Sequence, residues 1–387
     1  IARGPVSPMW VANGHTSTST LYTGNGTALP LVVNLPDVGG DEFEPTGMVF
    51  NGSSDFGITA GGKSSSSLFI FAGESGAIAG WSPNVDPANA VAAYVSDEGA
   101  LYTALAIAAT GSGNVLYAAD FRNGRIEVLN ANFEEENSFQ FSDPNPPAGD
   151  YKPFGIQALP TGANGTTEIY VAYAQQDPAT FDEVPGAGLG FVSVYDTSGN
   201  FLRQLIPAGG QLNAPWGMAL APENFGTLSK ALLVGNFGDG RINGYNPSTG
   251  EFIATITDST GAVFQVPGLW GIAFGNDAMN QPKDTLFYAA GINDEEHGEY
   301  GRIDLGDTPL FTQYLPASPS GFYHNTASIA DGLSRIVGYR KVELWPLVAL
   351  VGIERGEALG FFWRSLRDGM LIGVPLMGLL IGGMFWI

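Results

Sequence analysis

The sequence contains no cysteine among its 387 residues. This absence excludes disulfide bonds, thiolate metal sites and cysteine nucleophiles, although it does not identify the compartment. Histidine is almost as scarce, because only His15, His297 and His324 occur and they lie far apart in the chain. No two histidines have the spacing of a zinc-binding helix, so the sequence predicts no zinc site.

Basic residues are also few. Lys and Arg number 16 against 38 Asp and Glu, which gives a formal net charge of −22, and residues 1–330 carry 33 of the acidic residues. Such an acidic surface repels nucleic acid and anionic lipid headgroups, which excludes nucleic acid as a partner of this region. A basic soluble protein would be attracted to it, so we expect one as a partner.

Glycine and proline are abundant, with 54 Gly and 25 Pro, and 44% of the residues are hydrophobic. This composition argues against a helical protein and against disorder, and it favours an all-β protein with a substantial core. A four-residue pattern recurs, with Pro or an apolar residue, a variable residue, Gly, and then Met or Ile. Its copies are Pro45–Met48, Pro153–Ile156, Pro215–Met218 and Leu269–Ile272, with a weaker copy at Ala104–Ile107 and a degenerate one at Pro8–Val11.

Most copies are followed by two apolar runs that turn at pairs such as Asn123-Gly124 and Asp239-Gly240. These pairs favour the positive φ angles of two-residue hairpins. The spacing of about 40–60 residues suits the four-stranded blades of a β-propeller. The sequence therefore predicts an all-β, six-bladed β-propeller over residues 1–310, with units near residues 8–37, 45–85, 100–133, 151–205, 213–256 and 267–306.

These motifs resemble those of a known family. Pro215–Met218 and its copies, Gly76–Trp81, Asp120–Val128 and Asn293–Ile303 are similar to segments of a bacterial group of uncharacterised six-bladed propellers, often exported and sometimes carrying PEP-CTERM sorting tails. The resemblance covers residues 8–306. It implies a propeller fold and export, but no established activity and no catalytic residues. The tail departs from the family, because no Pro-Glu-Pro precedes a span and a terminal basic cluster.

The C-terminal residues have a different character. They divide into a predicted linker, 311–334, an interfacial or helical segment, 335–368, and a transmembrane helix, 369–387. The last contains the charge-free run Met370–Ile387, which as a helix would span about 27 Å, enough for the hydrocarbon core of a lipid bilayer. The sequence therefore predicts a helical tail whose single C-terminal transmembrane helix anchors the propeller.

Two sets of residues predict how this helix is used. Close packing against other membrane protein subunits is expected at two Gly-x-x-x-Gly pairs, which are formed by Gly369, Gly373, Gly378 and Gly382. Interfacial anchors are expected at Trp363, Arg364, Arg367 and Trp386. The basic residues before the span favour a cytoplasmic propeller, whereas the resemblance implies export. Between the two, we favour a bacterial membrane protein with its propeller on the periplasmic side.

No motif predicts catalytic, cofactor-binding or metal-binding residues. Gly57–Ser64 matches a phosphate-binding P-loop letter by letter, but a strand pattern follows it and no βαβ unit surrounds it, so we interpret it as a Gly/Ser loop. The acidic stretch Asp294–Glu299 lacks the alternating oxygen ligands of a Ca²⁺ loop and is predicted to be a solvated turn. Asp120 and Asn236 head equivalent hairpins, which favours turn capping over catalysis.

The sequence therefore predicts a non-enzymatic, membrane-anchored propeller without a cofactor. Its expected role is that of an accessory or scaffold subunit of a larger bacterial membrane complex, such as an energy-transducing (photosynthetic or respiratory) one. Two alternatives stay open. A Ca²⁺-dependent propeller hydrolase or lactonase would need Asp, Glu and Asn side chains that converge at the channel. A surface adhesion or sugar-binding module would need exposed aromatic platforms.

Overall fold

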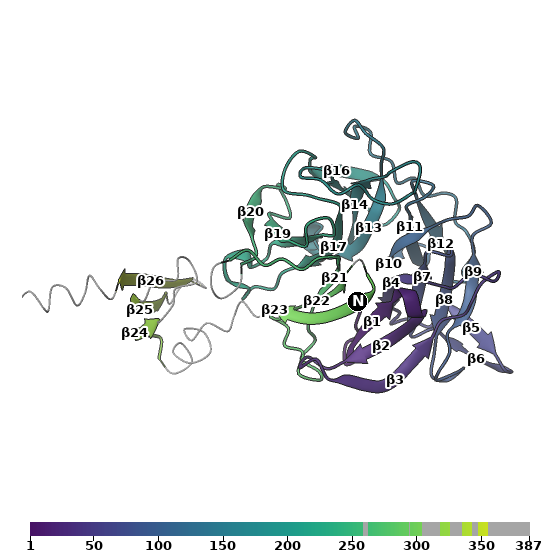
Figure 1. The fold of residues 1–387 in the computed structure, drawn as a ribbon, viewed down its shortest axis with the longest axis horizontal. Coiled ribbons are helices and arrows are strands. Elements are labelled where there is room, and N and C mark those ends of the chain that lie inside the picture. The colour runs from purple at the N-terminus through teal and green to yellow at the C-terminus, as the bar shows by residue number, and fades with distance from the viewer. Residues whose placement is uncertain (258–261, 294, 304–317, 326–334, 343–346, 355–387) are drawn as a thin grey trace, which may run out of the picture. The chain divides into compact units, whose positions relative to one another are not determined.

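The computed structural model describes residues 1–257, 262–293, 295–303, 318–325, 335–342 and 347–354 (Figure 1). These residues belong to two compact units. The larger unit contains residues 1–256 and 264–306, and the smaller unit contains residues 257–263 and 307–387.

The described residues of the larger unit form six antiparallel sheets of three or four strands, which follow one another in chain order around a central axis (Figure 1). The sheets are β1–β3 (Met9–Asn13, Thr18–Tyr22, Ala28–Asn34), β4 with β7–β9 (Pro45–Phe50, Phe69–Gly73, Ala77–Trp81, Val91–Val95), β10–β12 (Tyr102–Thr110, Gly113–Asp120, Arg125–Leu129), β13–β16 (Tyr151–Leu159, Glu168–Gln175, Phe191–Tyr195, Phe201–Ile206), β17–β20 (Pro215–Leu220, Leu232–Asn236, Ile242–Tyr245, Phe252–Thr255) and β21–β23 (Leu269–Phe274, Leu286–Ile292, His297–Ile303). Each sheet begins within one predicted repeat unit, although β9 lies beyond the second unit, 45–85. The all-β propeller prediction is confirmed.

The strands nearest the axis include β4, β10, β13, β17 and β21, and each packs against the next around the ring. The repeated glycines make this approach close. A Cβ atom on Gly155 would lie 2.2 Å from the carbonyl oxygen of Trp216 in the following sheet, and one on Gly271 would lie 2.7 Å from the nitrogen of Ile1. No side chain fits in that space, which explains why the repeat carries glycine.

The ring closes between the sixth sheet and the first. Ala2 forms an antiparallel bridge with Trp10, which places the first residues at the inner edge of the first sheet. From the sixth sheet, the side-chain amide of Asn276 donates hydrogen bonds of 2.8 Å to the carbonyl oxygens of Gly4 and Ser7. These contacts join the two ends of the propeller without any disulfide.

Two copies of the predicted repeat were assigned to the wrong residues. Pro8–Val11 overlaps β1, the second strand from the axis, because the bridge of Ala2 takes the inner place. In β10 the irregularity in pairing falls between Tyr102 and Ala104, as it falls between Pro45 and Gly47 in β4. The copy therefore reads Tyr102–Leu105. Alanine in place of glycine, within a run of small residues, makes the register ambiguous in the sequence.

The core lies between neighbouring sheets. Strands β7 and β8 are buried along their whole length. Ile70 and Ile78 of the second sheet pack with Leu105 and Leu116 of the third. Because burial contributes about 25 cal/mol per Å² of apolar surface, each blade gains much of its stability from its neighbours and the closed ring is the stable arrangement.

The smaller unit contains a three-stranded antiparallel sheet of β24 (Ser320–Asn325), β25 (Arg335–Val342) and β26 (Leu347–Glu354). The helical alternative predicted for 335–368 is therefore wrong for β25 and β26, and the interfacial alternative stays a prediction. Strand β24 lies in the predicted linker, 311–334. Strands β25 and β26 are rich in Val and Ile, whose branched side chains favour strands over helices.

Within the described part of the chain, no helix is long and apolar enough to cross a membrane. The predicted transmembrane helix, 369–387, lies outside the described residues. So do all the site residues that the sequence assigned to it, namely Gly369, Gly373, Gly378, Gly382, Trp363, Arg364, Arg367 and Trp386. The anchor and its packing surface therefore stay predictions.

Candidate binding site at the mouth of the channel

One end of the central channel is formed by the loops that follow the second strand of each sheet. Antiparallel pairing brings that end beside the start of the inner strand, as Pro45 pairs with Gly73. Glu44, just before β4, therefore lies next to Glu74, just after β7, and the backbone N–H of Glu74 donates to the carbonyl oxygen of Glu44 at 3.1 Å. The corresponding loop after β22 supplies Glu295. Carboxylates from separate blades thus reach one end of the channel, which we call the mouth.

A cavity of about 300 Å³ opens at the mouth. Its walls include one histidine from the first sheet, His15, and another from the sixth, His297. Among the described residues that line it, none is Lys or Arg. Five are acidic, namely Glu44, Glu74, Glu295, Glu296 and Glu299. The negative charge of the chain is therefore concentrated around this cavity, which suits a cationic ligand.

Two tryptophans, Trp216 and Trp270, also line this cavity, and both are half-buried. They occupy the variable position of the repeat, where the pairing of each inner strand is irregular. Such an irregularity re-aims a side chain. The two indoles are perpendicular, with ring centroids 5.3 Å apart and an interplanar angle of 89°. Phe154, at the same position of β13, lies 5.9 Å from the ring of Trp270.

Hydrogen bonds between blades, and one within the sixth blade, hold this aromatic layer in place. The hydroxyl of Thr103 donates to the carbonyl oxygen of Phe154 at 2.7 Å. The indole N–H of Trp216 donates to the carbonyl oxygen of Thr103 at 3.0 Å, and that of Trp270 donates to the Glu295 carboxylate. The aromatic layer therefore forms a rigid floor beneath the mouth cavity.

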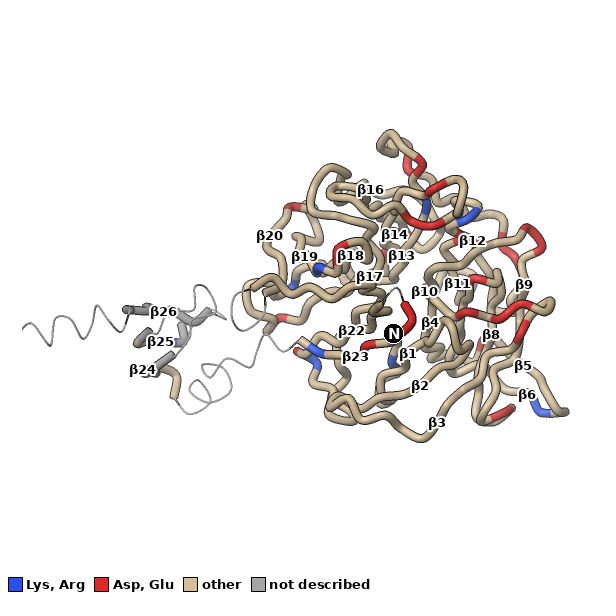
Figure 2. Tube along the Cα trace, viewed as in Figure 1, with Lys and Arg blue, Asp and Glu red and all other residues tan. Residues whose placement is uncertain are grey.

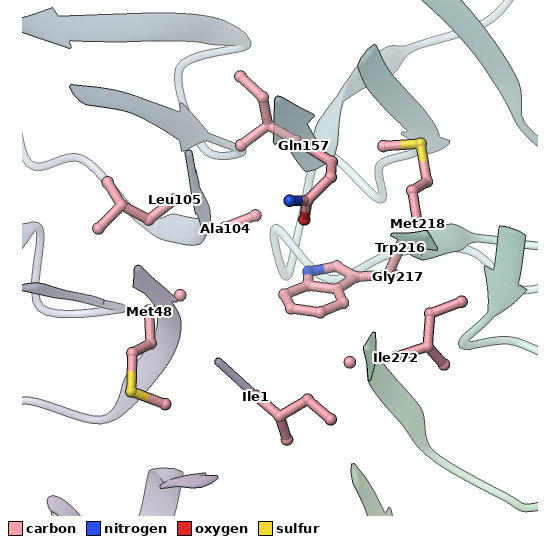
Figure 3. Close-up of a pocket in the computed structure, with 12 residues that line it drawn as sticks. Ile1, Met48, Ala104, Leu105, Gln157, Trp216, Gly217, Met218 and Ile272 are labelled. Carbon is pink, nitrogen blue, oxygen red and sulfur yellow. The ribbon is translucent and has the colours of Figure 1, made fainter. Parts of the chain in front are cut away.

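A second, much smaller cavity of about 30 Å³ adjoins the layer. Figure 3 shows the indole of Trp216 at its centre, with Met48, Leu105, Gln157 and Ile272 around it. Its volume is that of about one water molecule. We conclude that the mouth cavity, and not this one, has room for a ligand.

Burial, together with repulsion between carboxylates, raises the pKa of acidic groups at the mouth. The pKa of Glu74 is raised to about 7, mainly by burial and then by repulsion from Glu44, Glu295, Asp182 and Glu183. The pKa of Glu183 is also raised to about 7, again mainly by burial. Burial raises the pKa of Glu295, and the hydrogen bond from Trp270 and the nearby His15 oppose this. A cation placed among these groups would relieve the repulsion.

The backbone is strained where two of these carboxylates are presented. Glu44 has a φ of 45° and Glu295 a φ of 64°. Left-handed conformations of non-glycine residues cost on the order of 1 kcal/mol or more, and they persist where surrounding contacts enforce them. The hydrogen bonds from the backbone N–H of Glu74 and from the indole of Trp270 are such contacts.

The motifs that the sequence singled out differ in part from the predictions. The expected Gly/Ser loop is a pair of strands, and Asn236 differs from Asp120, because its Oδ1 accepts no hydrogen bond from a described residue and its Nδ2 donates to Gln211 and Asp239. Gly57–Ser64 lies in a hairpin of β5 (Gly57–Ala60) and β6 (Lys63–Ser66), with no helix at which phosphate could bind. Asp120 caps its turn by accepting from the backbone N–H of Asn123 at 3.2 Å. Among the described residues, no group of three or more His, Asp or Glu is arranged to hold a metal ion.

The stretch Asp294–Glu299 is only partly the solvated turn that was predicted. Glu296 and His297 are exposed, but Glu295 is half-buried and bonded to Trp270. Nothing in the sequence indicated that Glu44, Glu74 and Glu295 meet. The usable signal was the variable position of the repeat, which holds a Trp in two copies and points to the channel.

Comparison with known proteins places the chain among viral relatives. It is 31% identical over 301 residues to "Uncharacterized protein R648" of Acanthamoeba polyphaga mimivirus, which covers 76% of this chain and 72% of R648. This chain belongs to the same family as R648. A second mimivirus member, "Uncharacterized protein L690", is 31% identical over 274 residues, covering 68% of this chain and 70% of that protein. The bacterial family expected from the motifs, and its sorting tails, find no match among these relatives.

Other likenesses are weaker. A family described as "dCache_1_like: Histidine kinase sensor domain" matches residues 285–352, which is less than half of the chain. A chain from the nidogen/laminin complex matches with a TM-score of 0.47 and 14% identity, covering 76% of this chain and 88% of that one. A 6-phosphogluconolactonase-like protein from Bacteroides uniformis matches with a TM-score of 0.42 and 15% identity, covering 90% and 95%. Scores this low carry no argument about function.

Proposed function

We propose that the protein is a non-enzymatic binding propeller that receives a basic protein segment at the mouth of its channel. The observation that supports this is the mouth cavity, which has five carboxylates and no Lys or Arg among its described lining residues. Figure 2 shows how few basic residues the ring carries. Loops at the same end add exposed acidic residues such as Asp97 and Asp182. Such a field steers and orients a partner of opposite charge.

The setting we propose is that of an accessory or scaffold subunit tethered to a membrane and associated with other membrane subunits. It is supported by the charge-free run Met370–Ile387 and its flanking aromatic residues. The periplasmic side and the bacterial source rest on the sequence resemblance alone. The energy-transducing complex rests on the acidic surface, which would attract a cationic electron carrier. Purification of the full chain in mild detergent tests this setting: companion membrane subunits would support it, and a clean monomer would contradict it.

The binding role is tested with a fluorescently labelled decalysine peptide. Asp97→Lys/Asp182→Lys reverses two exposed charges at the mouth end, and we expect it to weaken binding about tenfold or more. Glu251→Lys/Asp284→Lys makes the same charge change in loops at the other end of the blades, and is the matched control. Equal losses in both double variants would mean that only net charge matters, and the proposed docking face would be wrong.

The Ca²⁺-dependent hydrolase is less well supported than binding. Aromatic side chains fill the channel beneath the mouth, and the described carboxylates there are not arranged as a metal site. A sugar-binding role is the second candidate, because indole rings and carboxylates together also suit a sugar. Binding of neutral oligosaccharides that is insensitive to salt would favour it over the basic partner.

A further inference from the structure

The walls of the mouth cavity are aromatic as well as acidic. Trp216 and Trp270 form its floor, and Tyr22 and Tyr300 stand at its side with their rings stacked at a centroid distance of 5.0 Å. These four side chains come from the first, fifth and sixth sheets, so the closed ring brings them together. A cavity of about 300 Å³ lies at the small end of the range for ligand pockets.

We propose that this cavity is a specific pocket for one organic ammonium group, held against the indoles and neutralised by Glu74. The proposal rests on the proposed binding function and names the chemical group that the site recognises. A lysine side chain of a partner and a free small amine both present this group.

The aromatic component favours an organic cation over a bare metal ion. Tryptophan has the strongest cation–π attraction of the aromatic side chains, and cages of such rings select alkylated ammonium groups. Perpendicular indoles offer a cation two surfaces at once, and Trp216 and Trp270 meet at 89°. A hydrated metal ion would gain little from these apolar walls.

The acidic component supplies the counter-charge. The Glu74 carboxylate has no hydrogen-bond or ion-pair partner among the described residues, although its backbone N–H is bonded to Glu44. Glu295 is already engaged with the indole of Trp270, and Glu299 accepts from the hydroxyl of Tyr288 at 2.6 Å. Three lining carboxylates, Glu44, Glu74 and Glu296, are therefore left to pair with a ligand. Glu296 is exposed, whereas Glu74 is half-buried and is repelled by both Glu44 and Glu295. A cation beside Glu74 would relieve this repulsion, and the half-buried position strengthens such a pair.

No Lys or Arg side chain is among the described residues that line the cavity. His15 and His297 line the cavity but are exposed. Arg125 is bonded to Glu98 and Glu127 in another part of the ring. An incoming ammonium group would therefore meet carboxylates without displacing a resident Lys or Arg. In this respect the carboxylates of the mouth differ from Glu168, whose carboxylate lies 2.8 Å from the guanidinium of Arg203.

The test is titration of the full chain at pH 8 with choline, n-butylammonium and the uncharged choline analogue 3,3-dimethylbutan-1-ol, followed by tryptophan fluorescence and calorimetry. We expect both cations to bind, and the alcohol, which has the same shape as choline, to bind at least about tenfold more weakly. Tighter binding of n-butylammonium identifies a lysine-like ligand, and tighter binding of choline identifies a methylated one. Equal binding of the alcohol, or no binding of either cation, overturns the proposal.

Three variants assign the effect to the pocket. Glu74→Gln keeps the shape of the side chain and should weaken cation binding about tenfold, without changing the weak binding of the alcohol. Trp270→Phe should weaken choline more than n-butylammonium, and its melting curve shows whether the ring still folds. Asp97→Asn removes one charge from the same end outside the pocket, and should change cation binding less than about twofold. Equal effects of Glu74→Gln and Asp97→Asn would contradict a specific pocket.

The two proposals can fail separately. If decalysine binds but the small cations do not, the acidic face is a docking surface without an ammonium pocket, and this inference is wrong. If choline binds but decalysine does not, the pocket is present and the basic protein partner is wrong.

Discussion

The mouth and the interior of the channel are built by the same inner strands but differ in chemistry. At the mouth, loops bring Glu44, Glu74 and Glu295 around a cavity of about 300 Å³. Just beyond the aromatic layer, the strands themselves line a space of about 30 Å³, and the described residues there are mostly apolar. The difference teaches that the strands supply rigidity and the loops supply recognition.

The largest expected effect comes from the close backbone contacts between neighbouring inner strands. Gly155→Ala would place a methyl group 2.2 Å from the carbonyl oxygen of Trp216, so backbone must shift. We expect a loss of about 3 kcal/mol in the free energy of unfolding by urea. Gly210→Ala is the control, because no described atom lies within 4 Å of the place that its added methyl group would take, and it should change stability by less than about 0.5 kcal/mol. Equal stability of the two variants would contradict the close approach of the inner strands at Gly155.

A slightly smaller effect is expected at the mouth, and it depends on pH. The folded-state pKa of Glu74 is raised to about 7, from an ordinary 4.5, mainly by burial. A carboxyl with a raised pKa costs stability as it ionises, so the cost grows as pH rises from 4.5 through 7. Glu74→Gln should therefore raise the free energy of unfolding by about 2–3 kcal/mol at pH 8 and by less than about 1 kcal/mol at pH 5.

The control for this pH dependence is Asp97→Asn, which alters an exposed carboxyl at the same end. Urea denaturation at both pH values gives the comparison. A gain for Glu74→Gln that is the same at pH 5 and pH 8 would show that its carboxyl is not under electrostatic stress. If the pocket binds ammonium ions, choline should stabilise the wild-type chain at pH 8 and reduce the advantage of the variant.

A moderate effect is expected from the bonds that support the floor. Thr103→Val removes the hydroxyl that donates to the carbonyl oxygen of Phe154 at 2.7 Å in a buried position. We expect a loss of about 1 kcal/mol in stability, together with weaker choline binding if the aromatic layer loosens. Thr59→Val, on the exposed hairpin of β5, should leave both unchanged. A neutral result at Thr103 would mean that packing alone holds the floor.

The smallest effect is expected at the P-loop look-alike. Lys63 is exposed on β6, in a hairpin whose turn residues Gly61 and Gly62 have φ values of 56° and 76°. Lys63→Ala should change stability by less than about 0.5 kcal/mol. Calorimetry with Mg–ATP should show no binding in the wild-type or variant chain, and binding that requires Lys63 would reverse this interpretation.

Much of the arrangement of the strands could be predicted from the sequence, because it depends on turn residues and on the repeated glycine. Asn123-Gly124 and Asp239-Gly240 lie in hairpin turns, as predicted, but the turns are residues 121–124 and 237–240 rather than two-residue turns, and only the glycine of each pair has a positive φ. The glycine of Pro215–Met218 fits where inner strands touch. Register could not be predicted at Ala104, since several small residues fit the same pattern. In the smaller unit, β25 and β26 are strands where a helix was one of the expected alternatives, because their branched Val and Ile side chains favour strands.

The sequence by itself determined the all-β class, the repeat of six units and the strong excess of negative charge. Only the tertiary structure decided where that charge matters. Glu44, Glu74 and Glu295 each look like an ordinary loop residue in the sequence. Glu44 and Glu74 are neighbours because β4 pairs with β7 in the second sheet, and Glu295 joins them from the sixth sheet because the closed ring brings the loops of both sheets to one axis. Closure of the ring also brings Trp216 and Trp270 into contact beneath the mouth cavity. The irregular pairing of β17 and β21 turns the side chain at this position toward the channel.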